Sequence, residues 1–272
     1  MKTIGVKVGS KYGFGDMDGL ISKSLKWGFD FFELSGADLK DYKFYSDLRK
    51  RGIKFGYHIP HAFTPENQIC LTATISPHKE KAEFWFKKAI EDSEKINSEY
   101  IIAHPDLYRI PKGNSRYPDG VDFANSREEG WQRLIEVLRA YHGKIPLLVE
   151  TMPSPEYYLY NLEESQKLIK ELPNIKFCFD IEHAYQSSED INKVIEWYRA
   201  IADKVLVFHF CDWNPKERGH LPISEGIIPF KKFINSVQLY DYQRPILEVM
   251  PYSKERAKSD LVLSKEKINK LI

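Results

Sequence analysis

The strongest constraint on the fold is a regular alternation of two kinds of segment along all 272 residues. Short runs rich in Val, Ile, Phe and Tyr are followed by longer stretches in which apolar side chains recur at helical spacing. Several short runs are almost continuously apolar, which is typical of strands buried on both faces of a parallel sheet. The predicted strands are residues 3–8, 30–35, 54–59, 100–105, 146–151, 176–181, 205–210 and 244–249.

Amphipathic patterns between these runs predict an equal number of helices. They lie near residues 16–27, 38–51, 79–96, 127–142, 161–171, 187–202, 229–238 and 253–270. Strict alternation of this kind predicts an α/β fold, a (β/α)8 TIM barrel formed as a single domain by residues 1–272. The alternative is a doubly wound open sheet, but the first turn, GSKYGFG at 9–15, has neither the dinucleotide-binding nor the P-loop spacing.

Composition argues against several classes of partner. The formal net charge of +1 gives no overall field that favours nucleic acid or anionic lipid. The sequence has no run of roughly 18 apolar residues, so no membrane span is predicted. Cys70, Cys178 and Cys211 are few, odd in number and outside any CxxC pair. They are interpreted as small buried residues in a reducing, cytoplasmic protein.

Ionisable side chains gather at the ends of the predicted strands. Seven of the eight strands carry a carboxylate or an imidazole there, and the candidates are Glu33, His58, His104, Glu150, Asp180, His209 and Glu248. The C-terminal ends of barrel strands surround one mouth, where active sites of this fold lie. We therefore expect residues up to about 190 positions apart to become neighbours in one ring.

Such a ring favours metal chemistry. Converging carboxylates repel one another and lose hydration, and a divalent cation removes both costs. Asp, Glu and His are ligands of Zn²⁺, Mn²⁺ and similar ions. Serine-nucleophile catalysis is disfavoured because the sequence has no GxSxG elbow. His183 and Asp212 follow two of the strands as further candidates, whereas Glu182 is expected to face solvent or start a helix.

The chain resembles the xylose isomerase-like barrels, which include sugar isomerases, epimerases and endonuclease IV-type phosphodiesterases. The motifs that carry the resemblance are HIP at 58–60, HPD at 104–106, VET at 149–151, DIEH at 180–183, HFCD at 209–212, RGHLPISEG at 218–226 and LEV at 247–249. Their order and spacing are specific for the superfamily but not for one member.

Likeness to the ketose 3-epimerases implies one divalent metal, Mn²⁺, Mg²⁺ or Co²⁺. Its ligands would be Glu150, Asp180, His209 and Glu248. The two glutamates would also act as acid and base, and His183 would bind substrate. Arg218 matches loosely an arginine that grips a substrate oxygen.

Likeness to endonuclease IV implies three Zn²⁺ ions and nine ligands. Eight of those positions are filled, by His58, His104, Glu150, Asp180, His183, His209, His220 and Glu248. The ninth should be an aspartate, and Arg218 stands there instead, which opposes the third metal. His58 and His104 favour this branch, because a single-metal epimerase does not need them.

The leading hypothesis is a metal-dependent isomerase or epimerase that abstracts a proton next to the carbonyl of a sugar or polyol. Glu33, His183, Arg218, His220, Asp212 and Trp213 are its predicted substrate-binding residues. The alternatives are an endonuclease IV-like phosphodiesterase acting on abasic DNA, with a second metal at His58 and His104, and a non-catalytic sugar-binding barrel. A nucleic-acid partner is disfavoured, and a homo-oligomer is left open.

Overall fold

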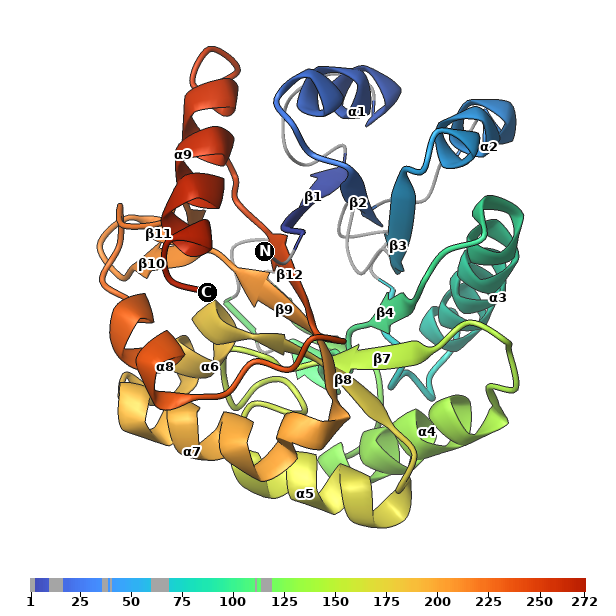
Figure 1. Ribbon diagram of the computed structural model, residues 1–272. Coiled ribbons are helices and arrows are strands. Elements are labelled where there is room, and N and C mark those ends of the chain that lie inside the picture. The colour runs from blue at the N-terminus through green and yellow to red at the C-terminus, as the bar shows by residue number, and fades with distance from the viewer. Residues whose placement is uncertain are drawn as a thin grey trace.

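The computed structural model describes residues 3–9, 17–35, 39, 41–59, 69–110, 112–113 and 119–272. In this part of the chain, parallel strands close into a barrel in the order β1-β12-β9-β8-β7-β4-β3-β2, as Figure 1 shows. The barrel confirms the predicted fold and excludes the open sheet. Its strands are β1 Gly5–Gly9, β2 Phe31–Ser35, β3 Lys54–His58, β4 Ile101–Ala103, β7 Leu147–Glu150, β8 Lys176–Asp180, β9 Val205–Phe210 and β12 Arg244–Leu247.

Helices connect the strands and surround the barrel (Figure 1). They are α1 Met17–Lys26, α2 Tyr42–Lys50, α3 His78–Ile96, α4 Arg127–Ala140, α5 Leu162–Glu171, α6 Ile181–Ser188, α7 Ile191–Ile201, α8 Phe230–Ser236 and α9 Ala257–Asn269, with a 3-10 turn at Ala202–Lys204. Side chains cap several of them; Ser126, for example, accepts a hydrogen bond from the backbone N–H of Glu129 at the start of α4.

The predicted helix 187–202 is wrong in its boundaries. Two helices, α6 and α7, occupy this region, and α6 begins directly after β8. Asp180 is both the last residue of β8 and the N-cap of α6, where its Oδ1 accepts the backbone N–H of His183 at 2.9 Å. The sequence DIEH is therefore a strand-to-helix junction.

Two small hairpins extend beyond the barrel. One pairs β5 Arg109–Ile110 with β6 Val121–Asp122, between β4 and α4. The other pairs β10 Asp212–Asn214 with β11 Arg218–Leu221. The glycine-rich turn 9–15 lies outside the described residues from position 10 onward.

The interior of the barrel is built in levels, because alternate residues of each strand point inward. One level is an apolar cluster formed by Phe31, Tyr100, Ile102, Leu148, Cys178, Val207 and Ile246. On β3 the corresponding place is taken by Gly56, where an added Cβ would collide with the ring of Tyr100. The next inward-facing residue on each strand lies two positions later, at the mouth of the barrel. The register of each strand therefore decides which side chains line the mouth.

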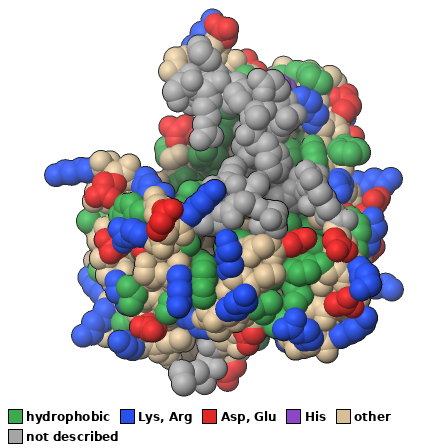
Figure 2. All heavy atoms as spheres, turned by 90° about the horizontal axis from the view of Figure 1, so that it is seen from above, with side chains coloured by type: hydrophobic (Ala, Val, Ile, Leu, Met, Phe, Trp, Pro, Cys, Tyr) green, Lys and Arg blue, Asp and Glu red, His purple; other side chains and the backbone are tan. Residues whose placement is uncertain are grey.

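All three cysteines are buried and free, as expected from their number and spacing. Among the described residues, no helix combines the length and the apolar character that crossing a membrane requires. On the side of the molecule shown in Figure 2, Lys and Arg side chains are interspersed with Asp and Glu over the described surface.

Candidate metal centre at the barrel mouth

Each barrel strand places one polar side chain at the mouth, two residues after the level of the apolar cluster. These residues are Lys7, Glu33, His58, His104, Glu150, Asp180, His209 and Glu248. None is more than 6% exposed. The structure therefore gathers all seven predicted strand-end residues in one buried polar network, together with one lysine that the sequence interpretation did not include.

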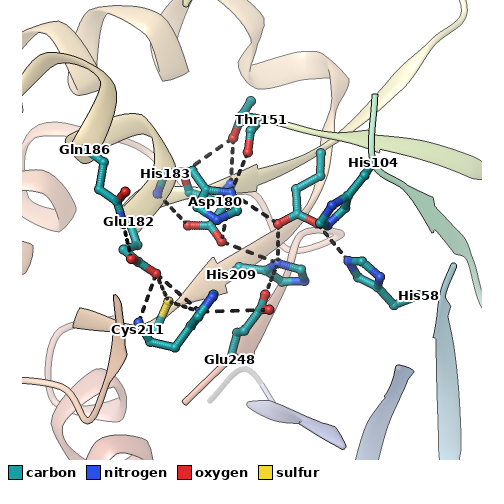
Figure 3. A network of polar contacts seen from close by, with 12 residues as sticks. His58, His104, Thr151, Asp180, Glu182, His183, Gln186, His209, Cys211 and Glu248 are labelled. Carbon is teal, nitrogen blue, oxygen red and sulfur yellow. Dashed lines mark hydrogen bonds and ion pairs between the residues drawn. The ribbon is translucent and has the colours of Figure 1, made fainter. Parts of the chain in front are cut away.

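Glu150 is the hub of this network. Its Oε2 lies 2.8 Å from Nε2 of His58 and 3.0 Å from Nε2 of His104. Its Oε1 lies 3.2 Å from Nδ1 of His209 and 3.5 Å from Nδ1 of His183. Figure 3 shows the imidazoles of His58, His104, His183 and His209 gathered in one network of polar contacts.

Four residues form a group that fits a divalent cation. Glu150, Asp180, His209 and Glu248 each offer one ligand atom, and these atoms lie within 4.8 Å of one another. Glu248 Oε2 is 2.6 Å from Nδ1 of His209. Asp180 Oδ2 is buried and has no hydrogen bond within the described chain; its nearest ionic partners are Nδ1 of His183 at 3.6 Å and Nδ1 of His209 at 3.7 Å. A buried carboxylate oxygen of this kind is costly without a cation.

A second group shares Glu150 with the first. His58, His104 and Glu150 also bring three ligand atoms within 4.8 Å of one another. The rings of His58 and His104 meet edge to face, with centroids 4.8 Å apart. One carboxylate thus stands between two potential metal positions.

Electrostatics hold the Glu150 carboxylate ionised. Burial by itself would raise the pKa of Glu150, but His104, His209 and Lys7 bring this pKa well below its usual value. Burial would likewise lower the pKa of His209, while the surrounding Cys178, Glu33 and Glu248 raise it well above its usual value. The imidazolium therefore acts as an internal counter-charge for the carboxylates.

Lys7 is the one mouth residue that the sequence does not predict. It lies on β1 and is 5% exposed, with Nζ 2.6 Å from Oε1 of Glu248 and 3.9 Å from Oε1 of Glu33. Its ammonium is not a metal ligand, unlike the carboxylates and imidazoles at the ends of the other strands. The same spacing that marks the other strand-end residues also places Lys7 at the mouth end of the first strand, and this spacing could have identified it.

Glu33 lies beneath the centre, with both oxygens near protein groups. Nε2 of His209 is 3.0 Å from its Oε1, and the hydroxyl of Tyr100 donates to its Oε2 at 2.9 Å. Such a partner fixes the orientation of a ligating imidazole. Its contacts therefore favour a role in positioning His209, whereas the sequence predicts that Glu33 binds substrate.

The remaining predicted substrate residues lie around the mouth in different settings. His183 directs Nδ1 to the backbone oxygen of Thr151 at 2.8 Å. The Asp212 carboxylate accepts backbone N–H groups of Trp213, Ser224 and Ile228 and so organises its own loop. The half-buried indole of Trp213 packs near Tyr185, with ring centroids 6.2 Å apart.

Arg218 contacts backbone and an aromatic ring. Its Nη2 donates to the backbone oxygen of Met250 at 2.6 Å, and its guanidinium lies 4.9 Å from the ring centroid of Tyr252. Of the two expectations for Glu182, a place at a helix start is confirmed, because it lies in the first turn of α6, whereas exposure to solvent is wrong, because this residue is 1% exposed. Its carboxylate faces Cys211 and His220, which lie beyond the reach of any local sequence pattern.

The fold and the mouth define a (β/α)8 protein with a candidate metal centre at the C-terminal ends of its strands. The chain belongs to the xylose isomerase-like TIM barrel family, which matches residues 21–267. A curated relative, an uncharacterised protein of Methanocaldococcus jannaschii, is 25% identical over 173 residues. That match spans 60% of this chain and 61% of the relative.

Solved structures from two branches of this fold superpose on nearly the whole chain. A D-tagatose 3-epimerase-like protein is 21% identical, with a TM-score of 0.71 over 100% of this chain and 97% of that one. Endonuclease IV from Thermus thermophilus is 18% identical, with a TM-score of 0.67 over 98% of this chain and 99% of that one. At these identities the likeness shows the shared fold alone.

The ion-free protein is expected to lose stability between about pH 6.5 and pH 9. Burial opposes protonation of His183, but Asp180 and Glu150 raise its pKa from 6.5 to about 9. Because the folded pKa is the higher one, this stabilisation is complete below pH 6.5 and is lost as pH rises through about 9. Urea unfolding at pH 6 and pH 9 measures the loss, which should shrink in His183→Gln.

With a divalent metal bound, the stability of the protein is expected to rise with pH instead of falling. Metal ligation requires neutral imidazoles and therefore strengthens as pH rises. The same urea series with saturating Mn²⁺ or Zn²⁺ tests this. If the metal stabilises the protein equally at both pH values, the imidazoles are not ligands.

Proposed function

We propose that the chain is a divalent-metal-dependent enzyme that moves a proton next to the carbonyl of a sugar or polyol, as an isomerase or epimerase does. One observation carries the proposal. Glu150 Oε1 and Glu248 Oε2 lie 3.2 Å and 2.6 Å from the same atom, Nδ1 of His209. Glu150 ends β7 and Glu248 directly follows β12, and β8 and β9 separate these two strands in the barrel. Two carboxylates therefore reach one point from different directions.

Two such bases suit epimerisation, in which a proton leaves one face of a carbon and returns to the other. Lys7 and His209 offset burial and hold the pKa of Glu248 well below its usual value, so its carboxylate is ionised and can accept a proton. One carboxylate, Glu150 or Glu248, accepts the proton that leaves the substrate carbon. The other must first take up a proton from solvent, which it then delivers to the opposite face. His183, whose side chain is 11% exposed, is placed to contact a substrate hydroxyl.

Glu150, Asp180, His209 and Glu248 would hold the metal, and the ion-free contacts fit that role. When bound, a divalent cation supplies electrostatic stabilisation of the negative charge that develops on the substrate oxygen. Their hard oxygen-rich set fits Mn²⁺, Mg²⁺ or Co²⁺.

Solvent exchange tests this function before the substrate is known in detail. Protein loaded with Mn²⁺ is incubated in deuterated water with a panel of ketoses and ketose phosphates, and incorporation at the carbon beside the carbonyl is followed by NMR. We expect exchange with at least one sugar and none with metal-stripped protein. Absence of exchange across the panel, with metal content verified, would contradict the proposal.

Metal-assisted phosphodiester hydrolysis is the second candidate, and a specific observation favours it. Nε2 of His58 and Nε2 of His104 both lie within 3.0 Å of Glu150 Oε2, so a second metal position adjoins the first. Paired metal positions sharing a ligand suit displacement at phosphorus. This candidate requires at least two Zn²⁺ ions per chain and cleavage of an abasic-site duplex or a simple phosphodiester.

The double variant His58→Gln, His104→Gln separates the two functions. A single-metal epimerase should keep its one metal and detectable solvent exchange, because all four ligands remain, although the loss of His104 raises the pKa of Glu150. A two-metal hydrolase should lose phosphodiester cleavage together with one equivalent of zinc.

A further inference from the structure

A third cluster of metal-ligand side chains, Glu182, Cys211 and His220, lies beside the centre, and of its members only His220 has a role predicted from the sequence. Cys211 Sγ is 2.9 Å from Glu182 Oε2, and Nδ1 of His220 lies 3.3 Å from the same oxygen and 3.4 Å from the sulfur. Figure 3 shows Glu182 and Cys211 directed toward each other, on the side of Glu248 away from His58. The three ligand atoms come from three different elements.

Local structure builds this cluster. Glu182 lies in the first turn of α6, Cys211 directly follows β9, and His220 belongs to β11. His220 adopts φ 52°, a left-handed conformation that is uncommon for a residue other than glycine. A Cβ at Gly219 would collide with Glu182 Oε1, so glycine there admits the carboxylate. The backbone thus departs from its ordinary preferences where the three side chains meet.

The geometry matches a tetrahedral ion of the zinc type. Bonds of about 2.3 Å to sulfur and about 2.0–2.1 Å to nitrogen or oxygen separate tetrahedral ligand atoms by about 3.3–3.6 Å. The Glu182–His220 and Cys211–His220 distances, 3.3 and 3.4 Å, match this range. The shorter Cys211–Glu182 distance is that of a thiol donating a hydrogen bond, whose proton a metal would replace.

The surroundings hold the ligands in place and leave one side accessible. Gln186 donates to Glu182 Oε1, and the backbone N–H of His220 donates to Oε2 at 3.2 Å. Glu182 and Cys211 are almost fully buried, whereas the His220 side chain is 23% exposed and offers a route of entry. Nδ1 of His220 is also 3.9 Å from Glu248 Oε1, which links this cluster to the main centre.

We propose that Glu182, Cys211 and His220 form an additional metal site for a thiophilic divalent ion, Zn²⁺ or Co²⁺. Thiolate and imidazole select such ions over Mg²⁺ and Mn²⁺, which prefer oxygen ligands. Three protein ligands leave a fourth coordination position open to water or to a substrate group. The site stands independently of the proposed function, because its ligands differ from those of the four-residue centre.

Cobalt spectroscopy tests the site without any substrate. Metal-stripped protein is titrated with Co²⁺, and the near-ultraviolet charge-transfer band of a thiolate–cobalt bond is recorded. We expect the band in the wild type, in Cys70→Ser and Cys178→Ser, and in Glu150→Gln, which disables the main centre. It should vanish in Cys211→Ser and require at least tenfold more cobalt in His220→Asn, because asparagine tolerates the left-handed backbone.

Three outcomes would overturn the site: wild-type protein that binds cobalt without the band, a band that persists in Cys211→Ser, or a band that depends on Cys178. The wild-type spectrum alone is decisive if a variant fails to fold. In each of these outcomes, the role of Glu182 is structural: its carboxylate accepts the backbone N–H of His220 and stabilises β11. Since the readout is a spectrum, failure of this proposal is distinguishable from failure of the proposed isomerase activity.

Discussion

Replacing Glu150 by glutamine is expected to abolish tight metal binding at the mouth and, with it, turnover of any substrate. The change keeps the shape of the side chain but removes the charge that three imidazoles share, with contacts of 2.8, 3.0 and 3.2 Å. Loss of a residue that only supports a ligand typically costs 10–100-fold in metal affinity. Loss of the shared ligand itself should cost more than about 100-fold.

Calorimetric titration of metal-stripped protein with Mn²⁺ and with Zn²⁺ measures this effect, and solvent exchange with the best sugar measures its catalytic consequence. The matched control is Glu136→Gln, because that carboxylate lies on α4 with its side chain 66% exposed. We expect wild-type affinity in the control. Unchanged metal affinity in Glu150→Gln would show that Glu150 is not a ligand of the centre. Sugar binding without turnover in both the wild type and Glu150→Gln would favour the non-catalytic sugar-binding barrel.

The ring at the mouth could be predicted because barrel geometry converts a local pattern into a long-range one. Glu150 and Glu248 are 98 positions apart, yet each follows a buried apolar run at the end of a strand. Closing the barrel brings strand ends to one mouth whatever the loops contain. Secondary-structure patterns and the chemistry of burying carboxylates were therefore sufficient to select these residues.

The cluster around Glu182 could not be predicted in the same way. Its position depends on α6 beginning at once after β8 and on the β10–β11 hairpin folding back over it. Hairpin placement depends on backbone conformations such as the positive φ of His220 and on close packing at Gly219, neither of which has a periodic sequence signature. Glu182 considered alone in the sequence resembles an ordinary first-turn glutamate at a helix N-terminus.

Lys7 shows a different limit of the sequence interpretation, because it follows the strand-end pattern but carries the opposite charge. Its ammonium stands 2.6 Å from Oε1 of Glu248 and supplies positive charge within the centre. A metal ion bound by Glu248 would supply the same charge. We infer that lysine and metal compete electrostatically for this carboxylate, with lysine stabilising the ion-free fold and opposing metal binding.

Lys7→Met is therefore expected to have opposite effects on the two states. Removing one partner of a buried ion pair typically costs about 3–5 kcal/mol, so the ion-free variant should unfold at lower urea concentration by roughly that free energy. The same variant should bind a divalent metal at least about tenfold more tightly, because a repulsion worth at least about 1.4 kcal/mol disappears from the bound state.

Urea unfolding and metal titration of the same samples measure both effects of Lys7→Met. Lys43→Met is the matched control, because Lys43 pairs with Asp47 at 2.8 Å on an exposed face of α2, with its own side chain 84% exposed. Exposed pairs of this kind contribute about 0–1 kcal/mol, so the control should change neither quantity appreciably. Weaker metal binding by Lys7→Met would instead mean that the ammonium stabilises the metal-bound state. Its partner in that state would then be an anionic group of the substrate or a metal-bound anion rather than Glu248. The direction of the change in affinity thus decides whether Lys7 substitutes for the metal or works beside it.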